Sequence, residues 1–486
     1  MIEMNNISYA YSNSKNKSLE NININIKTGE SVAFIGESVC GKTTLTRIIN
    51  GLAYRFYEGT MEGEIKIDGN CIKCKELYEI GRNVGSIFQN PKSQFFSEIV
   101  EDELAFGLEN YGIRREYMDS LIDDSLKSIN GINLREKNLF HLSSGERQKV
   151  AIASINALDP SIYVFDEPSA NLDMESVESL RNLMSDIKKM GKTIVVSEHR
   201  LYYLTEIIDT YYYLKNGKII NCFRKEDFIG MKKEYFRDMG IRNIALENIS
   251  ISDKKRKIIK YSLEVKNLSF SYKSKNVFKN LSYNFQSGAI YGVIGKNGVG
   301  KSTFSKILCG ILKENKGEIR LNNTRLNRKE RTEKIYYLTN NSDSNIFGVS
   351  IEEEIKLNGY IENVENLISK YNLLELKDRH PMTLSGGQKQ RLTIAASEIL
   401  ERKVFIFDEP TSGLDLKNMH LVANRMQYIK DRDKVVIVIS HDYEFLMEIC
   451  TDIIMLEANA ISTFNPSRDK ENILKILKNE NDRRKI

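Results

Sequence analysis

Two short segments of the chain place glycines, a lysine and hydroxyl side chains at the spacing G-x-x-x-x-G-K-[ST]. They are Gly36-Glu-Ser-Val-Cys-Gly-Lys-Thr-Thr44 and Gly295-Lys-Asn-Gly-Val-Gly-Lys-Ser-Thr303. Glycines let backbone amides approach a phosphate closely, and the N-terminus of a following helix favours negative charge. We expect the lysine to reach the β- and γ-phosphates of a nucleotide and the next hydroxyl to hold Mg²⁺. The residues predicted to bind the phosphates and the metal are Gly36, Gly41, Lys42, Thr43, Thr44, Gly295, Gly300, Lys301, Ser302 and Thr303.

A pair of carboxylates follows a short apolar strand later in each half of the chain. The pairs are Asp166-Glu167 and Asp408-Glu409. The aspartate at the end of such a strand is suited to hold Mg²⁺. The glutamate beside it would lie near the γ-phosphate, where it could orient or deprotonate the attacking water. A carboxylate at this place could instead cap the next helix, but its recurrence together with the glycine-rich loop favours catalysis.

These motifs belong to an internal repeat. The spacing is 242 residues from Ser143 to Ser385, from Asp166 to Asp408 and from His199 to His441, but 259 residues from Lys42 to Lys301. The first copy is therefore longer between its glycine-rich loop and its serine motif. We predict a domain at residues 1–225, a linker at 226–260 and a second domain at 261–486.

Each copy alternates apolar strands with helical segments, which predicts an α/β fold with a mostly parallel sheet. In such sheets, ligands bind beyond the carboxyl ends of the strands. The motifs place their polar residues at these ends.

Composition limits the function classes. The 486 residues are 41% hydrophobic and 28% charged, and 71 basic residues nearly balance 66 acidic ones. A protein that tracks nucleic acid usually carries a larger basic surplus, so no direct nucleic-acid partner is expected. We also expect no secretory signal and no membrane-spanning segment, because no apolar run reaches about 20 residues. Cys71 and Cys74 have the spacing of metal ligands but no second pair, which favours a reduced thiol pair over a zinc site.

Leu384-Ser-Gly-Gly-Gln388 resembles the signature motif of ABC ATPases, and Leu142-Ser-Ser-Gly-Glu146 resembles an altered form of it. Together with the other motifs, the resemblance covers nearly all of both halves. It implies two tandem P-loop NTPase domains of the ABC type, each with a mostly parallel sheet core, an antiparallel β subdomain and a helical subdomain. The segment Phe88-Gln-Asn-Pro-Lys-Ser-Gln-Phe-Phe96 resembles the energy-coupling ATPases of ECF-type importers.

The resemblance also implies roles for further residues. Gln89 is similar to the Q-loop glutamine that contacts Mg²⁺ and water, and His199 and His441 to the histidines that contact the γ-phosphate. Tyr11 and Tyr272 are similar to the aromatic residues that stack on adenine, although Tyr9 and Phe270 lie two residues away and one of each pair could belong to the core. Asp173 and Asp415 are similar to the D-loop aspartates. The signature residues expected to bind nucleotide are Ser143, Gly145, Ser385, Gly386, Gly387 and Gln388.

In this family two ATPase domains close face to face, so the chain is expected to form an internal pseudo-dimer. Each ATP would lie between one glycine-rich loop and the signature of the other half. The second composite site carries the altered signature with Ser144 and Glu146, and the position equivalent to Gln89 is Asn340. The first carries Val39 where the family usually has glycine, so either the loop avoids positive φ there or its shape is distorted. We therefore expect the first site to hydrolyse ATP faster.

The predicted function is ATP binding and hydrolysis that energises an ECF-type importer for a vitamin or metal ion, with ATP and Mg²⁺ as cofactors. The resemblance implies two partners, a transmembrane coupling protein and a small substrate-binding membrane protein, and a peripheral location on the cytoplasmic face of the membrane. Two alternatives are a tandem ABC ATPase of the ABC-F type that acts on ribosomes and the tandem ATPase of a sugar importer. The short segment between the halves and the weak net charge argue against the ribosomal alternative.

Overall fold

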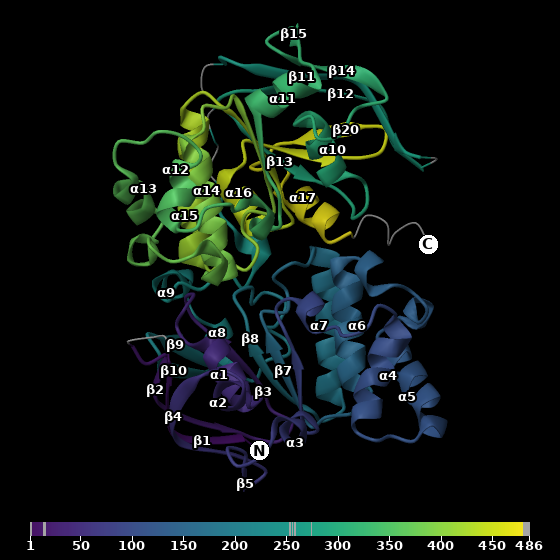
Figure 1. Cartoon of the computed structure of the whole chain (residues 1–486), viewed down its shortest axis with the longest axis vertical. Helices are drawn as coiled ribbons and strands as arrows, with labels where there is room; N and C mark the ends of the chain where they lie inside the picture. Colours follow the sequence, from purple (N-terminus) through teal and green to yellow (C-terminus); the bar gives the residue numbers. More distant parts are fainter. Residues whose placement is uncertain are drawn as a thin grey trace. The chain divides into compact units, whose positions relative to one another are not determined.

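The computed structural model describes residues 2–12, 16–251, 254, 256, 259–273 and 275–479. The chain forms two compact units, Met1–Ile244 and Ala245–Ile486 (Figure 1). The sequence alone does not assign a role to the C-terminal tail, residues 473–486. Its first part contributes to helix α17 (Lys470–Leu477), and residues 480–486 lie outside the described part of the chain.

The first unit contains two sheets. A four-stranded antiparallel sheet has the order β2-β1-β4-β5, and a six-stranded sheet has the order β10-β9-β3-β8-β7-β6. In the larger sheet only the edge pair β10–β9 is antiparallel. The strands are β1 (Ile2–Tyr11), β2 (Leu19–Ile26), β3 (Ser31–Ile35), β4 (Gly59–Ile67), β5 (Asn70–Cys71), β6 (Val84–Ile87), β7 (Ile162–Asp166), β8 (Thr193–Ser197), β9 (Thr210–Lys215) and β10 (Lys218–Arg224).

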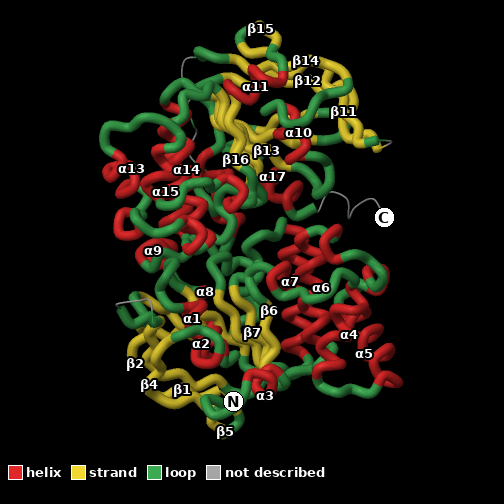
Figure 2. The backbone as a smooth tube through the Cα atoms, in the orientation of Figure 1, coloured by secondary structure: helices red, strands yellow, loops and turns green. Residues whose placement is uncertain are grey.

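The helices of the first unit cover the larger sheet on both faces. Figure 2 shows α4, α5 and α6 grouped as a helical layer beside the sheet, while α1 and α2 lie on the side of the antiparallel strands. The helices are α1 (Lys42–Ile49), α2 (Leu52–Arg55), α3 (Leu77–Gly81), α4 (Val100–Asn110), α5 (Arg115–Ser128), α6 (Ser144–Asn156), α7 (Met174–Lys189), α8 (Lys225–Ile229) and α9 (Lys233–Asp238).

Alternating residues of the central strand divide the core into two layers. Val32 and Phe34 of β3 pack with α1 and the antiparallel sheet, whereas Ala33 and Ile35 pack with α4–α7. A strand that is buried on both faces reads as a continuous apolar run, which is why the sequence shows no alternation here. Phe228 of α8 also belongs to the second layer, so part of the segment expected as a linker adds to the core of the first unit.

The second unit repeats this topology. Its antiparallel sheet has the order β12-β11-β14-β15, and its larger sheet has the order β16-β17-β18-β13-β19-β20. The strands are β11 (Ser262–Tyr272), β12 (Lys275–Gln286), β13 (Ile290–Ile294), β14 (Lys316–Leu321), β15 (Thr324–Arg325), β16 (Ile335–Leu338), β17 (Val404–Asp408), β18 (Val435–Ile439), β19 (Asp452–Leu456) and β20 (Ile461–Phe464). The helices besides α17 are α10 (Lys301–Leu308), α11 (Arg328–Lys334), α12 (Ile351–Lys356), α13 (Val364–Lys370), α14 (Gly386–Ile399), α15 (Leu416–Asp431) and α16 (Tyr443–Ile449).

The predicted α/β fold with two tandem domains is confirmed, including an antiparallel sheet and a helical layer in each. Within the part of the chain that the structure describes, no helix is both long and apolar enough to cross a membrane. In each unit the three parallel strands that carry the motifs end at the same edge of the sheet. This edge positions the candidate site.

Candidate nucleotide sites of the two halves

The phosphate-binding loop of each half connects a central strand to a helix. In the first half, the buried Lys42 Nζ donates hydrogen bonds to the carbonyl oxygens of Gly36 and Glu37, both at 3.0 Å. In the second half, Lys301 Nζ donates to Gly295 at 2.7 Å and to Lys296 at 3.2 Å. Each lysine is thus held inside the curve of its own loop, where its positive charge is available to a phosphate.

The first glycine of each loop is required by a close approach of the backbone. A Cβ atom at Gly36 would lie 2.3 Å from the carbonyl oxygen of Leu214, and one at Gly295 would lie 2.6 Å from that of Leu456. Both glycines also have strongly positive φ values, 145° and 151°. The loop can therefore turn over the end of the neighbouring strand only with glycine at this position.

The aspartates at the ends of β7 and β17 accept hydrogen bonds from the hydroxyl that follows each lysine. Thr43 Oγ1 lies 3.1 Å from Asp166 Oδ1, and Ser302 Oγ lies 2.9 Å from Asp408 Oδ2. Burial, reinforced by the neighbouring charge of Glu167, raises the pKa of Asp166 to about 6. Burial also raises the pKa of Asp408.

These residues fit a magnesium ion. A carboxylate beside a hydroxyl provides the hard oxygen donors that Mg²⁺ prefers. Burial disfavours the negative charge of each aspartate, and a bound cation would offset this cost. Thr43 and Asp166 would hold the ion in the first half, and Ser302 and Asp408 in the second.

The predicted catalytic glutamate of the first half lies among the predicted polar residues. Gln89 Nε2 donates to Glu167 Oε2 at 2.7 Å, and His199 Nε2 lies 3.4 Å from Glu167 Oε1. Glu167 has a φ of 46°, and its amide donates to the carbonyl oxygen of Ser197 at 2.8 Å. A non-glycine residue held at positive φ is a strained conformation that is found at functional sites.

The corresponding glutamate of the second half has different partners. Glu409 shares the positive φ, at 52°. Its Oε2 accepts from Ser440 Oγ at 3.2 Å and from the His441 amide at 3.4 Å, and His441 Nε2 lies 3.8 Å from its Oε1. Both halves thus bring the glutamate and the histidine together, with Gln89 as a further partner of the glutamate in the first half and Ser440 in the second.

The signature serines begin helices. Ser143 caps α6 and Ser385 caps α14, each in a capping box with the residue three positions later. The carboxylate of Glu146 accepts from the Ser143 amide at 2.8 Å, and this bond holds its pKa below the usual value. A Cβ at Gly386, the counterpart of Ser144, would meet nothing within 4 Å. Within its own half, the altered signature is therefore accommodated without a clash.

Two further pairs of predicted residues occupy equivalent places. Tyr11 Oη lies 3.4 Å from Thr44 Oγ1, and Tyr272 Oη lies 3.4 Å from Thr303 Oγ1. Their neighbours Tyr9 and Phe270 are buried, whereas Tyr272 is 46% exposed. The D-loop aspartates Asp173 and Asp415 cap helices α7 and α15.

Three residues beside the site are absent from the predicted set. Ser197 Oγ donates to Asp166 at 2.8 Å, and Tyr337 Oη donates to Asp408 at 2.9 Å. The buried carboxylate of Glu198 accepts from the amides of His199 and Arg200 and orders this loop. The position of Ser197 at a strand end was the one available sequence signal.

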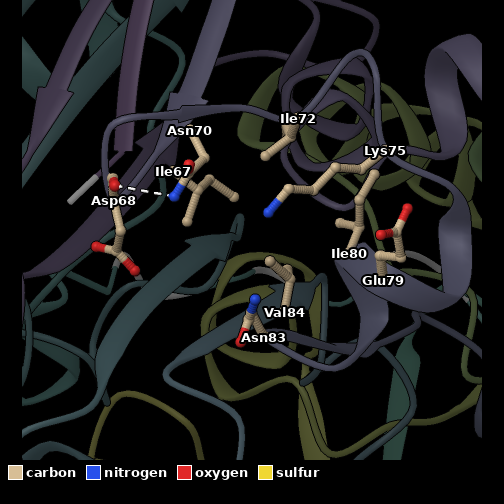
Figure 3. Close-up of a pocket in the computed structure, with 9 residues that line it drawn as sticks. All are labelled: Ile67, Asp68, Asn70, Ile72, Lys75, Glu79, Ile80, Asn83 and Val84. Carbon is tan, nitrogen blue, oxygen red and sulfur yellow. Dashed lines mark hydrogen bonds between the residues drawn. The ribbon is translucent and has the colours of Figure 1, made fainter.

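Other candidate features do not belong to this site. Figure 3 shows a pocket next to the β4–β5 turn that contains none of the motif residues. It is lined by Ile67, Asp68, Asn70, Ile72, Lys75, Glu79, Ile80, Asn83 and Val84. Cys71 and Cys74 are free thiols, and the described residues contain no group of three or more His, Cys, Asp or Glu arranged to hold a metal.

The geometry defines the class of protein, an ATPase with two ABC-type nucleotide-binding domains. The model of the family "ABC transporter" matches residues 19–170 and 278–412. A Treponema denticola protein, named provisionally as an ABC transporter ATP-binding protein, is 37% identical over 95% of this chain and 96% of its own length. The chain belongs to the ABC transporter family and is an ATP-hydrolysing ABC protein with tandem domains.

More distant relatives show the range of this architecture. Bacillus subtilis YkoD, named provisionally as an HMP/thiamine import ATP-binding protein, is 28% identical over 95% of this chain and 91% of its own length. The crystal structure of an archaeal ribosome recycling factor, aABCE1 in complex with ribosomal stalk protein aP1, aligns with a TM-score of 0.64 and 18% identity. It covers 96% of this chain and 92% of that one. At this identity the likeness concerns the fold alone.

Proposed function

We propose that this chain is the ATP-hydrolysing subunit of an ECF-type importer for a vitamin or a metal ion. The observation that carries the proposal is an exposed aromatic segment directly after Gln89. Phe96 is 77% exposed and stacks on Phe106, with ring centroids 4.7 Å apart. The ECF-like sequence around Gln89 and the similarity to YkoD support an import role.

A buried glutamate fixes this segment in each half. Glu103 accepts from the amides of Phe96 and Ser97 at 2.8 and 2.9 Å. Glu354 accepts in the same way from the amides of Phe347 and Gly348. An exposed aromatic side chain on a rigid backbone is suited to dock an apolar partner. We infer that the partner is the transmembrane coupling protein, which would hold this subunit at the cytoplasmic face of the membrane.

The proposed mechanism is phosphoryl transfer to water. Lys42 and Lys301 stabilise the phosphate charge, and Glu167 and Glu409 orient water for attack on the γ-phosphate. Bound Mg²⁺ would supply further charge stabilisation on the phosphate oxygens. His199 and His441 lie near the same glutamates, at 3.4 and 3.8 Å, and would sense the γ-phosphate.

We propose that each ATP also contacts the signature of the other half. The first site then pairs Lys42 with Ser385, and the second pairs Lys301 with the altered signature at Ser143. ATP binding would close the halves and hydrolysis would release them. Because the departures Ser144, Glu146 and Asn340 fall on the second site, we expect slower turnover there.

Separate Glu167→Gln and Glu409→Gln variants test the unequal sites. We expect Glu167→Gln to abolish most steady-state phosphate release and Glu409→Gln to leave a substantial part. Equal losses would contradict unequal turnover at the two sites. They would not contradict the conclusion that the chain hydrolyses ATP.

Co-purification tests the transport role. The full chain, expressed in its native host and extracted from membranes with mild detergent, should carry two integral membrane proteins. The Phe96→Ser variant should lose them, while Tyr78→Ser, which changes another well exposed aromatic side chain, on α3, should keep them. Recovery with ribosomal particles instead would refute the import proposal in favour of the ABC-F alternative.

A further inference from the structure

The two halves support their metal-binding aspartate from opposite sides. Asp166 on β7 accepts a hydrogen bond from Ser197 on β8, at 2.8 Å. Asp408 on β17 accepts one from Tyr337 on β16, at 2.9 Å. Strands β8 and β16 flank the aspartate strand on different sides of the sheet order. The supporting hydroxyl therefore comes from different neighbouring strands.

Strand register shows that the two halves differ at two equivalent positions beside the aspartate. Asp166 pairs with Ser197 across β7–β8, but the equivalent pair across β17–β18 joins Asp408 to Ile439. An isoleucine side chain offers no donor, so the second half lacks the hydroxyl that Ser197 supplies.

The other neighbouring strand compensates for this loss. Ser86 pairs with Val164 across β6–β7, and Tyr337 pairs with Ile406 across β16–β17, so Ser86 and Tyr337 occupy equivalent positions. The short hydroxyl of Ser86 accepts from Asn50 Nδ2 at 3.0 Å. The tyrosine extends a phenol to the aspartate from the same place on the backbone.

We infer that Tyr337 is a positioning residue that takes the place of Ser197 and sets the metal affinity of the second half. Ser302 Oγ also donates to Asp408 Oδ2, at 2.9 Å. When the Ser302 hydroxyl binds a cation through a lone pair, its proton can still be donated to Asp408, and Tyr337 provides a second, independent donor that orients the carboxylate from the neighbouring strand. Donors behind a metal ligand of this kind change metal affinity by about 10- to 100-fold when they are removed. The inference rests on metal–nucleotide binding by the second half and is independent of transport.

The test measures metal affinity at the second half alone. In a Lys42→Ala background, binding of Mn²⁺ with ATP to the full chain is followed by electron paramagnetic resonance. We expect Tyr337→Phe to weaken Mn²⁺ binding about tenfold while ATP binding in EDTA stays unchanged. Ser86→Ala, the matched change in the first half, should have no effect.

A rescue experiment separates positioning from packing. Adding Ile439→Ser to Tyr337→Phe provides the second half with the hydroxyl position of the first, and we expect Mn²⁺ affinity to return to within about threefold of the background. The inference is overturned if Tyr337→Phe binds Mn²⁺ normally, or if the weakened variant is not rescued by Ile439→Ser. Absence of any Mn²⁺–ATP binding in the Lys42→Ala chain would refute the second nucleotide site and the inference with it.

Discussion

Val39 stores backbone strain in the first phosphate-binding loop, and its replacement by glycine should stabilise the protein. The sequence left open whether the loop avoids positive φ at this residue, and the structure shows a φ of 66°. The counterpart in the second loop is Gly298, with a φ of 76°. Val39 is 82% exposed, so glycine would lose little buried apolar surface.

The size of the effect follows from two opposing contributions. A β-branched residue in the left-handed region costs about 1–3 kcal/mol. Glycine has more conformational freedom in the unfolded chain, which offsets about 0.5–1 kcal/mol of the relief. With the middle of each range, the net gain is about 1 kcal/mol. Since 1 kcal/mol shifts Tm by about 2–4 °C for a domain of 150–250 residues, Val39→Gly should raise Tm by about 2–4 °C.

Differential scanning calorimetry of the nucleotide-free protein measures this shift, and the second half provides the matched control. A Cβ at Gly298 would meet nothing within 4 Å, so Gly298→Val introduces backbone strain at a position with open space around the Cβ. It should lower Tm by a similar amount. A lower or unchanged Tm for Val39→Gly together with an unchanged Tm for Gly298→Val would refute the strain argument.

Two further predictions concern the first catalytic centre. Gln89→Asn removes the 2.7 Å hydrogen bond to Glu167. Hydrogen bonds to charged groups contribute about 1.5–3 kcal/mol, so kcat for phosphate release should fall about 10- to 100-fold. The affinity for ATP should change little. The opposite change, Asn340→Gln, should not reduce kcat, and equal losses in both variants would contradict this assignment. Asp166→Asn should raise the Tm of the nucleotide-free protein more at pH 8 than at pH 5, and should weaken stabilisation by Mg²⁺ and ATP. The reason is that the folded pKa of about 6 exceeds the usual 3.8, so ionisation of Asp166 removes up to about 3 kcal/mol of stability as pH rises through this window. A Tm gain independent of pH would argue against a buried charge.

The sequence predicts well whatever depends on contiguous residues. Each glycine-rich loop stands between a central strand and a helix as expected, because its glycines are needed where the loop passes a neighbouring strand. Asp166 and Asp408 also end their strands as expected, because each follows a contiguous apolar run that forms a buried strand. Phe96 and Phe347 follow Gln89 and Asn340 at the same distance in sequence, and buried glutamates hold both segments alike, which agrees with the expected equivalence of Gln89 and Asn340.

Contacts between strands that are distant in sequence were beyond prediction. Ser197 and Ser440 look like counterparts because each stands close before a histidine. The sheet register instead pairs Asp408 with Ile439, and Ser440 contacts Glu409. A single-residue shift in register changes which face a side chain occupies, and no motif records it.

The two catalytic glutamates differ in their link to the segment proposed to dock the partner. In the first half, one residue, Gln89, lies at the start of the segment that presents Phe96 and bonds directly to Glu167. In the second half, Glu409 is held by Ser440 and His441, which follow strand β18, and Asn340 is one methylene shorter than glutamine. A membrane partner that moves the Phe96 segment would therefore shift Glu167 through a single hydrogen bond, while Glu409 would respond to its own histidine loop. On this reasoning, we propose that the first half would couple hydrolysis to the partner and that the second half would report the presence of nucleotide.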